Sequence, residues 1–477
     1  MVGLIDGNNF FVSCERVFNR RLVGRPVAVL SNNDGCCVSR SNEFKALGID
    51  MGTPYYQLKN REKSGELDFC SSNYELYGDM SRRIISILRE EALDVEQYSI
   101  DEAFITPPSM EALGNGELVT GNGDEDFAPN RSPSPIPHSP FPVPSSPFPI
   151  PRSPYLAYGR RLRSKILRWV GIPCGVGFAP TKTLAKIANH IGKKQPGGVF
   201  LLPDDPTEIL ASLPAGEVWG VGRRLALKLR AERIFSAKDL RDASDDVIRS
   251  VGGVVLLRTA TELRGKPCNE ERDYDADPDS VSCSRSFGEP VTTLDGISES
   301  LASFTAQAAT KLRRHSMLAA GCNIYAQIFR SGGGGECIER TVMFPEPTDA
   351  TNAMLDAIRP EVPALFLPGT RYRKTGVVFF GLEKANAPRQ LDLFSTDLRS
   401  PFPPLLGHRL RRLASLGGYV PRSPSPLYKA IDAINARYGK GKVFSASEGI
   451  GERSWKMKRS KLSKRASTRW DELMAVR

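Results

Sequence analysis

The sequence predicts a multidomain α+β protein, and three observations support that fold class. The chain has 477 residues, 40% of them hydrophobic and 25% charged, which suffices for about two to four domains with cores of their own. Strand-like and helix-like apolar patterns alternate along it, and a late module combines helices with long strands. Proline-rich stretches within 107–154 and 399–426 interrupt these patterns, which indicates exposed inserts rather than core.

Charge and cysteine content narrow the function classes. Lys and Arg number 65 against 54 Asp and Glu, and the net charge of +11 favours a polyanionic partner such as nucleic acid. Nine cysteines without CxxC pairs fit a reducing compartment rather than a disulfide framework. No apolar run approaches the roughly 20 residues of a membrane span, and the N-terminus lacks a signal-peptide pattern, so we expect a cytoplasmic protein without membrane contact.

Carboxylates end the first apolar segment and interrupt a later one. The first segment predicts a buried strand that ends at Asp6, followed by Gly7 and two Asn residues able to cap a helix. In YSIDEAF, a hairpin turn near 99–102 would place Asp101 and Glu102 at one tip, where they repel unless a cation lies between them. Three such carboxylates would suit Mg²⁺. The alternatives are a solvated turn for the pair and a helix or turn cap for Asp6.

Two later segments predict phosphate contacts. Residues 172–198 predict a strand and then a helix whose lysines, at 182 and 186, either approach a phosphate chain or form a solvated basic face. Residues 213–240 have the pattern of a helix-hairpin-helix, in which backbone amides can hold a DNA phosphate without reading sequence. An ordinary helical turn is the alternative there. The hairpin itself consists of Gly220, Val221 and Gly222.

A compact α+β module follows. SCSRSFGE precedes an amphipathic helix at 298–315, and residues 322–344 predict a hairpin around the glycine-rich loop at 331–336. A second helix is expected at about 349–359 and a strand at 372–384. The basic residues of these strands suit a DNA backbone.

Taken in order, the motifs resemble those of Y-family translesion DNA polymerases, most closely the UmuC-type catalytic subunits of bacterial DNA polymerase V. They are LSNNDGCCVSRSNEFKALGIDMG, SSNYELYGDMS, YSIDEAF, APTKTLAKIANH, VWGVGRR, TELRGKPC and SCSRSFGE. The resemblance covers nearly all of the chain. The resemblance implies a right-hand polymerase with a ferredoxin-like palm. Its parts would be a palm at 1–10 and 74–200 with the 107–154 insert, fingers at 11–73, a helix-hairpin-helix thumb at 201–266, a linker at 267–280, a little finger at 281–382 and a C-terminal region at 383–477.

The resemblance also implies roles for individual residues. Two Mg²⁺ ions would be held by the three carboxylates and a backbone carbonyl, and an aromatic ring would act as a steric gate that excludes a 2′-OH. Many relatives have Tyr at that position, but Phe keeps the wall. The implied residues are Asp6, Gly7, Asp101 and Glu102 for metal, with the three acids catalytic, Phe11 for the gate, and Ser39, Arg40, Lys45 and Lys193 for the triphosphate.

Partners are implied in the same way. QLDLF resembles the bacterial sliding-clamp motif, with Gln390, Leu391, Leu393 and Phe394 as anchors, although a short turn packed on its own chain is the alternative. The family further implies primed, damaged DNA, dNTPs, a processed UmuD-type dimer, a RecA filament and nucleoid association in the SOS response. Residues 453–477 carry nine basic and two acidic side chains, which indicates partner or DNA contacts or else a disordered basic tail.

The sequence therefore predicts error-prone translesion DNA synthesis by a two-metal mechanism. The alternative is a non-catalytic DNA- and clamp-binding repair factor, against which the intact Asp6, Asp101 and Glu102 argue. A nucleotide cyclase with a related palm would leave the helix-hairpin-helix and the clamp-like motif unexplained.

Overall fold

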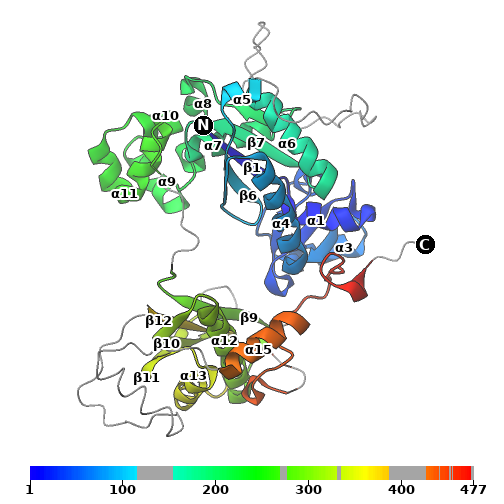
Figure 1. Ribbon diagram of the computed structural model, residues 1–477, viewed down its shortest axis with the longest axis vertical. Coiled ribbons are helices and arrows are strands. Elements are labelled where there is room, and N and C mark those ends of the chain that lie inside the picture. The colour runs from blue at the N-terminus through cyan, green and yellow to red at the C-terminus, as the bar shows by residue number, and fades with distance from the viewer. Residues whose placement is uncertain are drawn as a thin grey trace, which may run out of the picture. The chain divides into compact units, whose positions relative to one another are not determined.

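The computed structural model of the chain describes residues 1–114, 154–268, 277–329, 335–385, 426–439, 441–450, 453 and 455–473. The chain forms two compact units, drawn in Figure 1. The first comprises Met1–Ser31, Gly35–Asp273 and Lys461–Arg477, and the second Asn32–Asp34 and Tyr274–Ser460. Both mix helices and strands, as predicted. The clamp-like motif, the glycine-rich loop at 331–334 and almost all of both proline-rich inserts lie outside the described residues.

A five-stranded sheet forms the centre of the first unit. The strand order is β5-β6-β1-β7-β8, and β1 pairs antiparallel with both β6 and β7. The strands are β1 Val2–Gly7, β5 Asp94–Gln97, β6 Glu102–Thr106, β7 Cys174–Ala179 and β8 Val199–Leu201. The strand and hairpin predicted around the carboxylates are thus confirmed as β1 and as β5 with β6.

Successive side chains of β1 point to opposite faces of this sheet. Ile5 packs in the cluster that contains the apolar residues of α4 and α6, whereas Leu4 packs in the cluster that contains those of α7. Because side chains alternate along a strand, Asp6 shares the face of Leu4, the face covered by α7. These helices are α4 Tyr74–Glu91, α6 Pro154–Val170 and α7 Lys182–Gly192, and a short helix, α5 Met110–Gly114, follows β6.

A smaller sheet and a helical region complete the first unit. The smaller sheet has the order β3-β2-β4, so β4 is an edge strand. It lies in the segment predicted as fingers, with β2 Val27–Leu30, β3 Cys37–Arg40, β4 Asp68–Ser71, α1 Phe10–Phe18, α2 Asn42–Ala46 and α3 Tyr55–Lys63. The segment predicted as thumb is helical, with α8 Thr207–Ser212, α9 Arg223–Ala231, α10 Ala237–Asp242 and α11 Asp245–Leu263.

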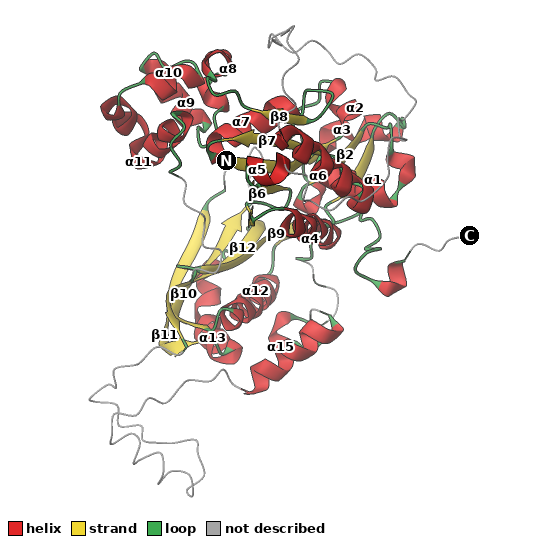
Figure 2. Cartoon of the chain, turned by 45° about the horizontal axis from the view of Figure 1, so that its top comes forward, coloured by secondary structure: helices red, strands yellow, loops and turns green. Residues whose placement is uncertain are grey.

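The second unit is a four-stranded antiparallel sheet with two helices packed on one face, as Figure 2 shows. Its strand order is β11-β10-β12-β9, so the predicted hairpin forms and a further strand, β12, joins its inner member. The elements are β9 Val281–Val291, α12 Leu294–Arg314, β10 Met317–Ile328, β11 Cys337–Thr348, α13 Thr351–Ile358 and β12 Tyr372–Lys384.

Residues beyond 425 also pack on the second unit. The helix α15, Pro426–Tyr438, places Asp432 2.6 Å from the Arg313 guanidinium of α12. Further along, Trp455 is 6% exposed and its ring centroid lies 5.5 Å from that of Phe304. The core of this unit therefore extends well past residue 382, the predicted end of the little finger. No helix in the described part of the chain has the length and apolar character to cross a membrane.

Candidate active site

The end of β1 and the turn before β6 bring the predicted carboxylates together. Asp6 and Glu102 are direct partners across the antiparallel β1–β6 ladder, and such partners have Cβ atoms about 5 Å apart on one face. The turn closes with the amides of Tyr98 and Ser99 each donating to the Glu102 carbonyl at 3.0 Å. The Gly7 amide donates to the Asp101 carbonyl at 2.9 Å, which holds the turn against the end of β1.

Two lysines of α7 and its C-cap neutralise this acidic pair. Lys193 Nζ lies 2.6 Å from Asp6 Oδ2, and Lys186 Nζ lies 3.0 Å from Glu102 Oε2. The Lys186 ammonium also lies 4.6 Å from the ring centroid of Tyr98 and 4.9 Å from that of Trp219. The prediction of a solvated basic face on this helix is wrong, because Lys186 is enclosed by aromatic rings and paired with a carboxylate.

Two glycines of β7 let the lysines reach the acids. Gly175 is the β7 partner of Asp6, and a Cβ there would lie 2.5 Å from Lys193 Cγ. A Cβ on Gly177 would lie 2.1 Å from the backbone nitrogen of Asn189, so this glycine lets α7 approach the sheet closely. The contact between Lys193 and Asp6 therefore depends on the absence of a side chain at 175.

Burial makes Asp6 hard to ionise even with its lysine in place. Burial raises the pKa of Asp6 to about 6; Lys193 opposes this rise, whereas Glu102 and Asp101 add to it. Within the described ranges no three His, Cys, Asp or Glu side chains are gathered as a ready-made metal cage, and lysine ammonium groups contact Asp6 and Glu102. Carboxylates, together with substrate phosphates, are the ligands that Mg²⁺ prefers, so the chemistry of these residues fits the predicted metal site.

Lys45 of the predicted fingers lies within electrostatic range of the same carboxylate. Burial, Arg40 and Lys193 lower the pKa of Lys45, whereas Asp6 raises it. Lys45 and Lys193 therefore lie within electrostatic range of each other and of Asp6, as the triphosphate prediction requires. Arg40 donates to the Ile49 carbonyl, and its Nε has no partner among the described residues. Ser39 is 8% exposed within β3, and this burial argues against its predicted triphosphate contact.

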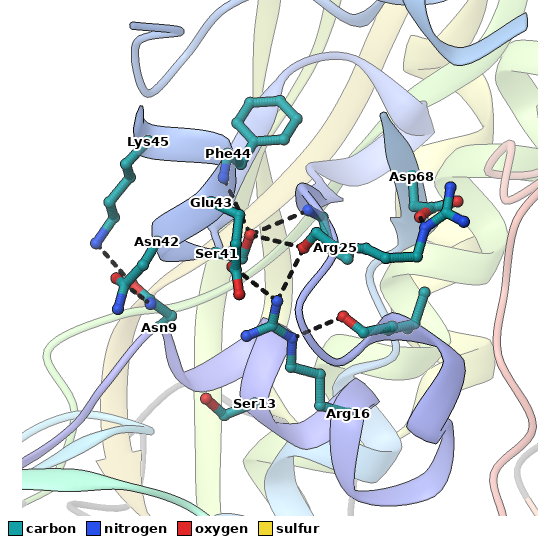
Figure 3. A network of polar contacts seen from close by, with 12 residues as sticks. Asn9, Ser13, Arg16, Arg25, Ser41, Asn42, Glu43, Phe44, Lys45 and Asp68 are labelled. Carbon is teal, nitrogen blue, oxygen red and sulfur yellow. Dashed lines mark hydrogen bonds and ion pairs between the residues drawn. The ribbon is translucent and has the colours of Figure 1, made fainter. Parts of the chain in front are cut away.

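A polar network joins α1 to α2, as Figure 3 shows. Lys45 donates to Asn9 Oδ1 at 2.6 Å, and Asn9 Nδ2 donates to Asn42 Oδ1 at 3.0 Å. Arg16 and Glu43 form an ion pair at 2.8 Å in the same network. The prediction that these Asn residues cap the helix is only partly right, because Asn9 occupies the N-cap position in a left-handed conformation and its side chain makes no capping bond.

The predicted steric gate lies next to this network on α1. The Phe11 ring stacks on Tyr77 of α4 with centroids 4.6 Å apart and an interplanar angle of 14°. The Tyr74 ring meets it edge-on at 5.9 Å. Phe11 is half-buried, so its ring is fixed from one side by aromatic neighbours while part of it stays exposed. This is the arrangement expected of a rigid wall rather than of a residue enclosed in the core.

The predicted DNA-phosphate hairpin has an irregular first half. A 3₁₀ turn at Ala215–Glu217 stands where the sequence predicted a helix, and α9 begins directly after Gly222. Gly220 has a φ of 88°, which favours glycine, and Val221 is buried at 7% exposure. Val221 thus anchors the turn while the backbone amides that begin α9 stay outside the core.

Sequence reasoning missed two charged residues that organise the site. Lys186 was considered for phosphate contact or as part of a solvated basic face, although it is the partner of Glu102. Glu15 was not considered. The signal in the sequence is a Glu four residues after the predicted gate, within an otherwise apolar helix. The structure shows that this Glu is buried, which is unusual for its residue type.

Comparisons with known proteins match this arrangement. Residues 5–190 match the impB/mucB/samB family, and residues 278–393 match the C-terminal domain of that family. Protein UmuC of Salmonella typhimurium strain LT2 is 35% identical over 485 residues, which span 100% of both chains. The chain belongs to the impB/mucB/samB family of Y-family DNA polymerases. The family predicted from the motifs is therefore confirmed.

More distant relatives define the shared fold. MucB of Escherichia coli is 32% identical over 98% of each chain, and DNA polymerase IV 1 of Bacillus subtilis is 27% identical over 82% of this chain and 84% of its own. A solved Y-family DNA polymerase chimera of Dbh and Dpo4 superposes with a TM-score of 0.56 at 18% identity, covering 80% of this polymerase and 99% of the chimera. Residues 425–476 match a domain of unknown function.

Proposed function

We propose that this polymerase extends primers across damaged template bases, with Asp6, Asp101 and Glu102 as its catalytic carboxylates. The observation that carries the proposal is the pairing of Asp6 with Glu102 across β1 and β6, beside the Asp101 turn. Lysines from two different parts of the chain, Lys45 and Lys193, surround the same carboxylate. An acidic cluster bordered by cations is suited to nucleotidyl transfer, in which positioning and charge neutralisation dominate.

The three carboxylates and the Gly7 carbonyl would hold two Mg²⁺ ions, which would activate the primer hydroxyl and neutralise the triphosphate. Burial is the main cause of the raised pKa of Asp6, about 6, and a cation bound beside the carboxylate would offset that cost of burial, which supports this role. Lys186 keeps Glu102 oriented from the α7 side and stays shielded from solvent by Tyr98 and Trp219.

Lys45 and Lys193 bind the incoming triphosphate, and Arg40 adds positive charge beside Lys45. In the chain alone, Lys45 donates to Asn9 and Lys193 pairs with Asp6. A bound triphosphate would compete for both ammonium groups: its charge-assisted bond to Lys45 is stronger than the bond to the neutral Asn9 amide, and at Lys193 it offers more negative charge than the single Asp6 carboxylate. Phe11, held by its stack on Tyr77, excludes a ribose 2′-OH from the sugar site.

Several partners belong to the same proposal. Primed DNA would contact the Gly220–Gly222 turn through backbone amides, without reading its sequence. A sliding clamp would bind QLDLF, residues 390–394, and a processed UmuD-type dimer and a RecA filament would support synthesis. The supporting observations are the motif itself and full-length similarity to a protein named UmuC.

Primer extension past an abasic site tests the catalytic proposal. Asp101→Ala should abolish incorporation while binding of primed DNA, followed by fluorescence anisotropy, is retained. Glu208→Ala, which removes an exposed carboxylate from α8, is the matched control and should extend at the wild-type rate. A wild-type chain that binds primed DNA but incorporates no dNTP would support the alternative of a non-catalytic DNA- and clamp-binding factor.

A further inference from the structure

The C-terminal strap, residues 461–473, is attached to the edge of the smaller sheet. The Ser71 amide donates to the Lys461 carbonyl at 3.0 Å, and the Lys461 amide donates to Ser71 Oγ at 2.9 Å. Ser71 and Leu462 form a parallel bridge, so the strap covers the end of edge strand β4. Lys461 also pairs with Glu62 of α3. A disordered basic tail, one interpretation of the sequence, is therefore wrong for this segment.

Ser463 of the strap joins a buried network between α1 and α4. Its hydroxyl donates to Glu15 Oε1 at 3.0 Å and accepts from Asn73 Nδ2 at 2.9 Å. Tyr77 donates its hydroxyl to the same Glu15 oxygen at 2.6 Å. Asn73 is also the N-cap of α4, where its side chain accepts from the Leu76 amide. One serine of the strap thus binds the carboxylate of α1 and the cap of α4.

Glu15 depends on these hydroxyls. It is 2% exposed, and no lysine or arginine of the described residues forms an ion pair with it. Burial raises its pKa, and the hydrogen bonds from Tyr77 and Ser463 lower it. A buried carboxylate without a cation is costly unless its acceptor sites are filled. Loss of the Ser463 hydroxyl would remove one of the two hydroxyl donors that Glu15 has among the described residues.

The network ends at the predicted steric gate. Glu15 lies four residues after Phe11 on α1, so both side chains occupy one face of the helix. Tyr77 contacts both of them, since its hydroxyl binds Glu15 and its ring stacks on Phe11 at 4.6 Å. The bond to Glu15 therefore fixes the plane of the ring that supports Phe11.

We propose that the strap, through Ser463 and Glu15, positions Tyr77 against Phe11 and thereby sets discrimination between deoxyribonucleotides and ribonucleotides. Ser463 is a positioning residue in this proposal and does not touch the nucleotide. The strap lies within the segment that matches a domain of unknown function, and the proposal gives its last part a role in the active site. The inference rests on the proposed function of Phe11 as the gate.

The test compares kcat/KM for single dNTP and rNTP incorporation by the full chain. Ser463→Ala should raise the rNTP-to-dNTP ratio about fivefold, the change expected for a coupled contact of moderate strength. Incorporation of dNTP should stay within about twofold of wild type. Ser463→Thr keeps the hydroxyl and should keep the ratio. Thr468→Ala is the matched strap control, because its hydroxyl bonds only within the strap, to the Arg465 carbonyl.

Two further variants separate the possible failures. Deletion of residues 461–477 should raise the rNTP-to-dNTP ratio at least as much as Ser463→Ala does. The double variant Glu15→Gln with Ser463→Ala should change this ratio by less than the product of the two single effects. An unchanged ratio in Ser463→Ala, or equal losses of activity for both nucleotides, overturns the inference about the strap. If the ratio rises in Phe11→Ala at the same time, the assignment of Phe11 as the gate still stands. An unchanged ratio in Phe11→Ala overturns the gate assignment and the inference with it.

Discussion

Replacing Gly175 by alanine tests whether the contact between Lys193 and Asp6 serves nucleotide binding. The new Cβ would lie 2.5 Å from Lys193 Cγ and 3.2 Å from its Cε, closer than carbon atoms pack. The nearer clash is with Cγ, close to the base of the side chain, so rotation of the distal torsions cannot relieve it. We expect Lys193 to change rotamer near its base, which breaks the 2.6 Å contact of Nζ with Asp6.

The expected loss is mainly in nucleotide binding. A displaced Lys193 no longer meets the triphosphate, and loss of one charge-assisted contact of about 1.4 kcal/mol corresponds to a tenfold rise in KM for dNTP. The free energy of unfolding should change by less than about 1 kcal/mol, because the pair is partly exposed and such pairs contribute little to stability.

The pH dependence gives a second measure of the same displacement. Asp6 has to lose its proton to act as a ligand, so extension falls as pH falls through its pKa of about 6. Lys193 lowers that pKa, so its displacement raises the pKa and moves the acid limb of the profile to higher pH.

Single-turnover primer extension at varied dNTP concentration and pH measures both effects. Gly78→Ala in α4 is the matched control, since its Cβ would meet only Arg82 Nη1, at 3.9 Å, and its kinetics should match wild type. Lys193→Met should reproduce the changes of Gly175→Ala. A KM for dNTP within about twofold of wild type together with an unshifted acid limb would refute the reasoning.

Three further changes test the charges and the packing. Asp6→Asn should raise the thermal midpoint of unfolding at pH 7 in EDTA. The pKa of Asp6 is about 6 in the folded chain and 3.8 ordinarily, so the stability of the wild type falls as pH rises between these values. An unchanged midpoint would contradict this reasoning. Lys186→Met should tighten Mg²⁺ binding without nucleotide in calorimetry, because the ammonium competes for Glu102; weaker binding would exclude that competition. Arg313→Ala should cost about 3 kcal/mol in urea unfolding by leaving Asp432 unpaired, whereas a cost below about 1 kcal/mol would show that α15 is loosely held.

The secondary structure that carries the candidate site was predicted correctly where the sequence signal is local. An apolar strand ending in an acid and a two-acid hairpin turn are patterns within a few residues, and the strand and hairpin that carry Asp6, Asp101 and Glu102 form as predicted. The helix after β7 was predicted from its 3.6-residue periodicity. Side-chain partners were harder, because a helix pattern shows that Lys182 and Lys186 share a face but does not show which strands that face covers.

The contacts that sequence reasoning missed join residues far apart in the chain. Ser463 binds Glu15 and Asn73, hundreds of residues away, and no periodicity relates these positions. The cap expected at Asn9 formed differently because its side chain has stronger partners in Asn42 and Lys45. Tertiary contacts of this kind override local preference, and the sequence alone contains no signal for them.

The charge arrangement around Asp6 links nucleotide binding to assembly of the site. Before a nucleotide binds, Lys193 and Lys186 each neutralise one carboxylate, and burial, with smaller contributions from Glu102 and Asp101, still raises the pKa of Asp6. A triphosphate adds negative charge and competes for Lys193, so Asp6 then needs other cations. Lys186 does not face the same competition, because Tyr98 and Trp219 enclose it. In the proposed mechanism the two lysines of one helix region would therefore differ in function: Lys193 would exchange between carboxylate and phosphate, and Lys186 would hold Glu102 in place.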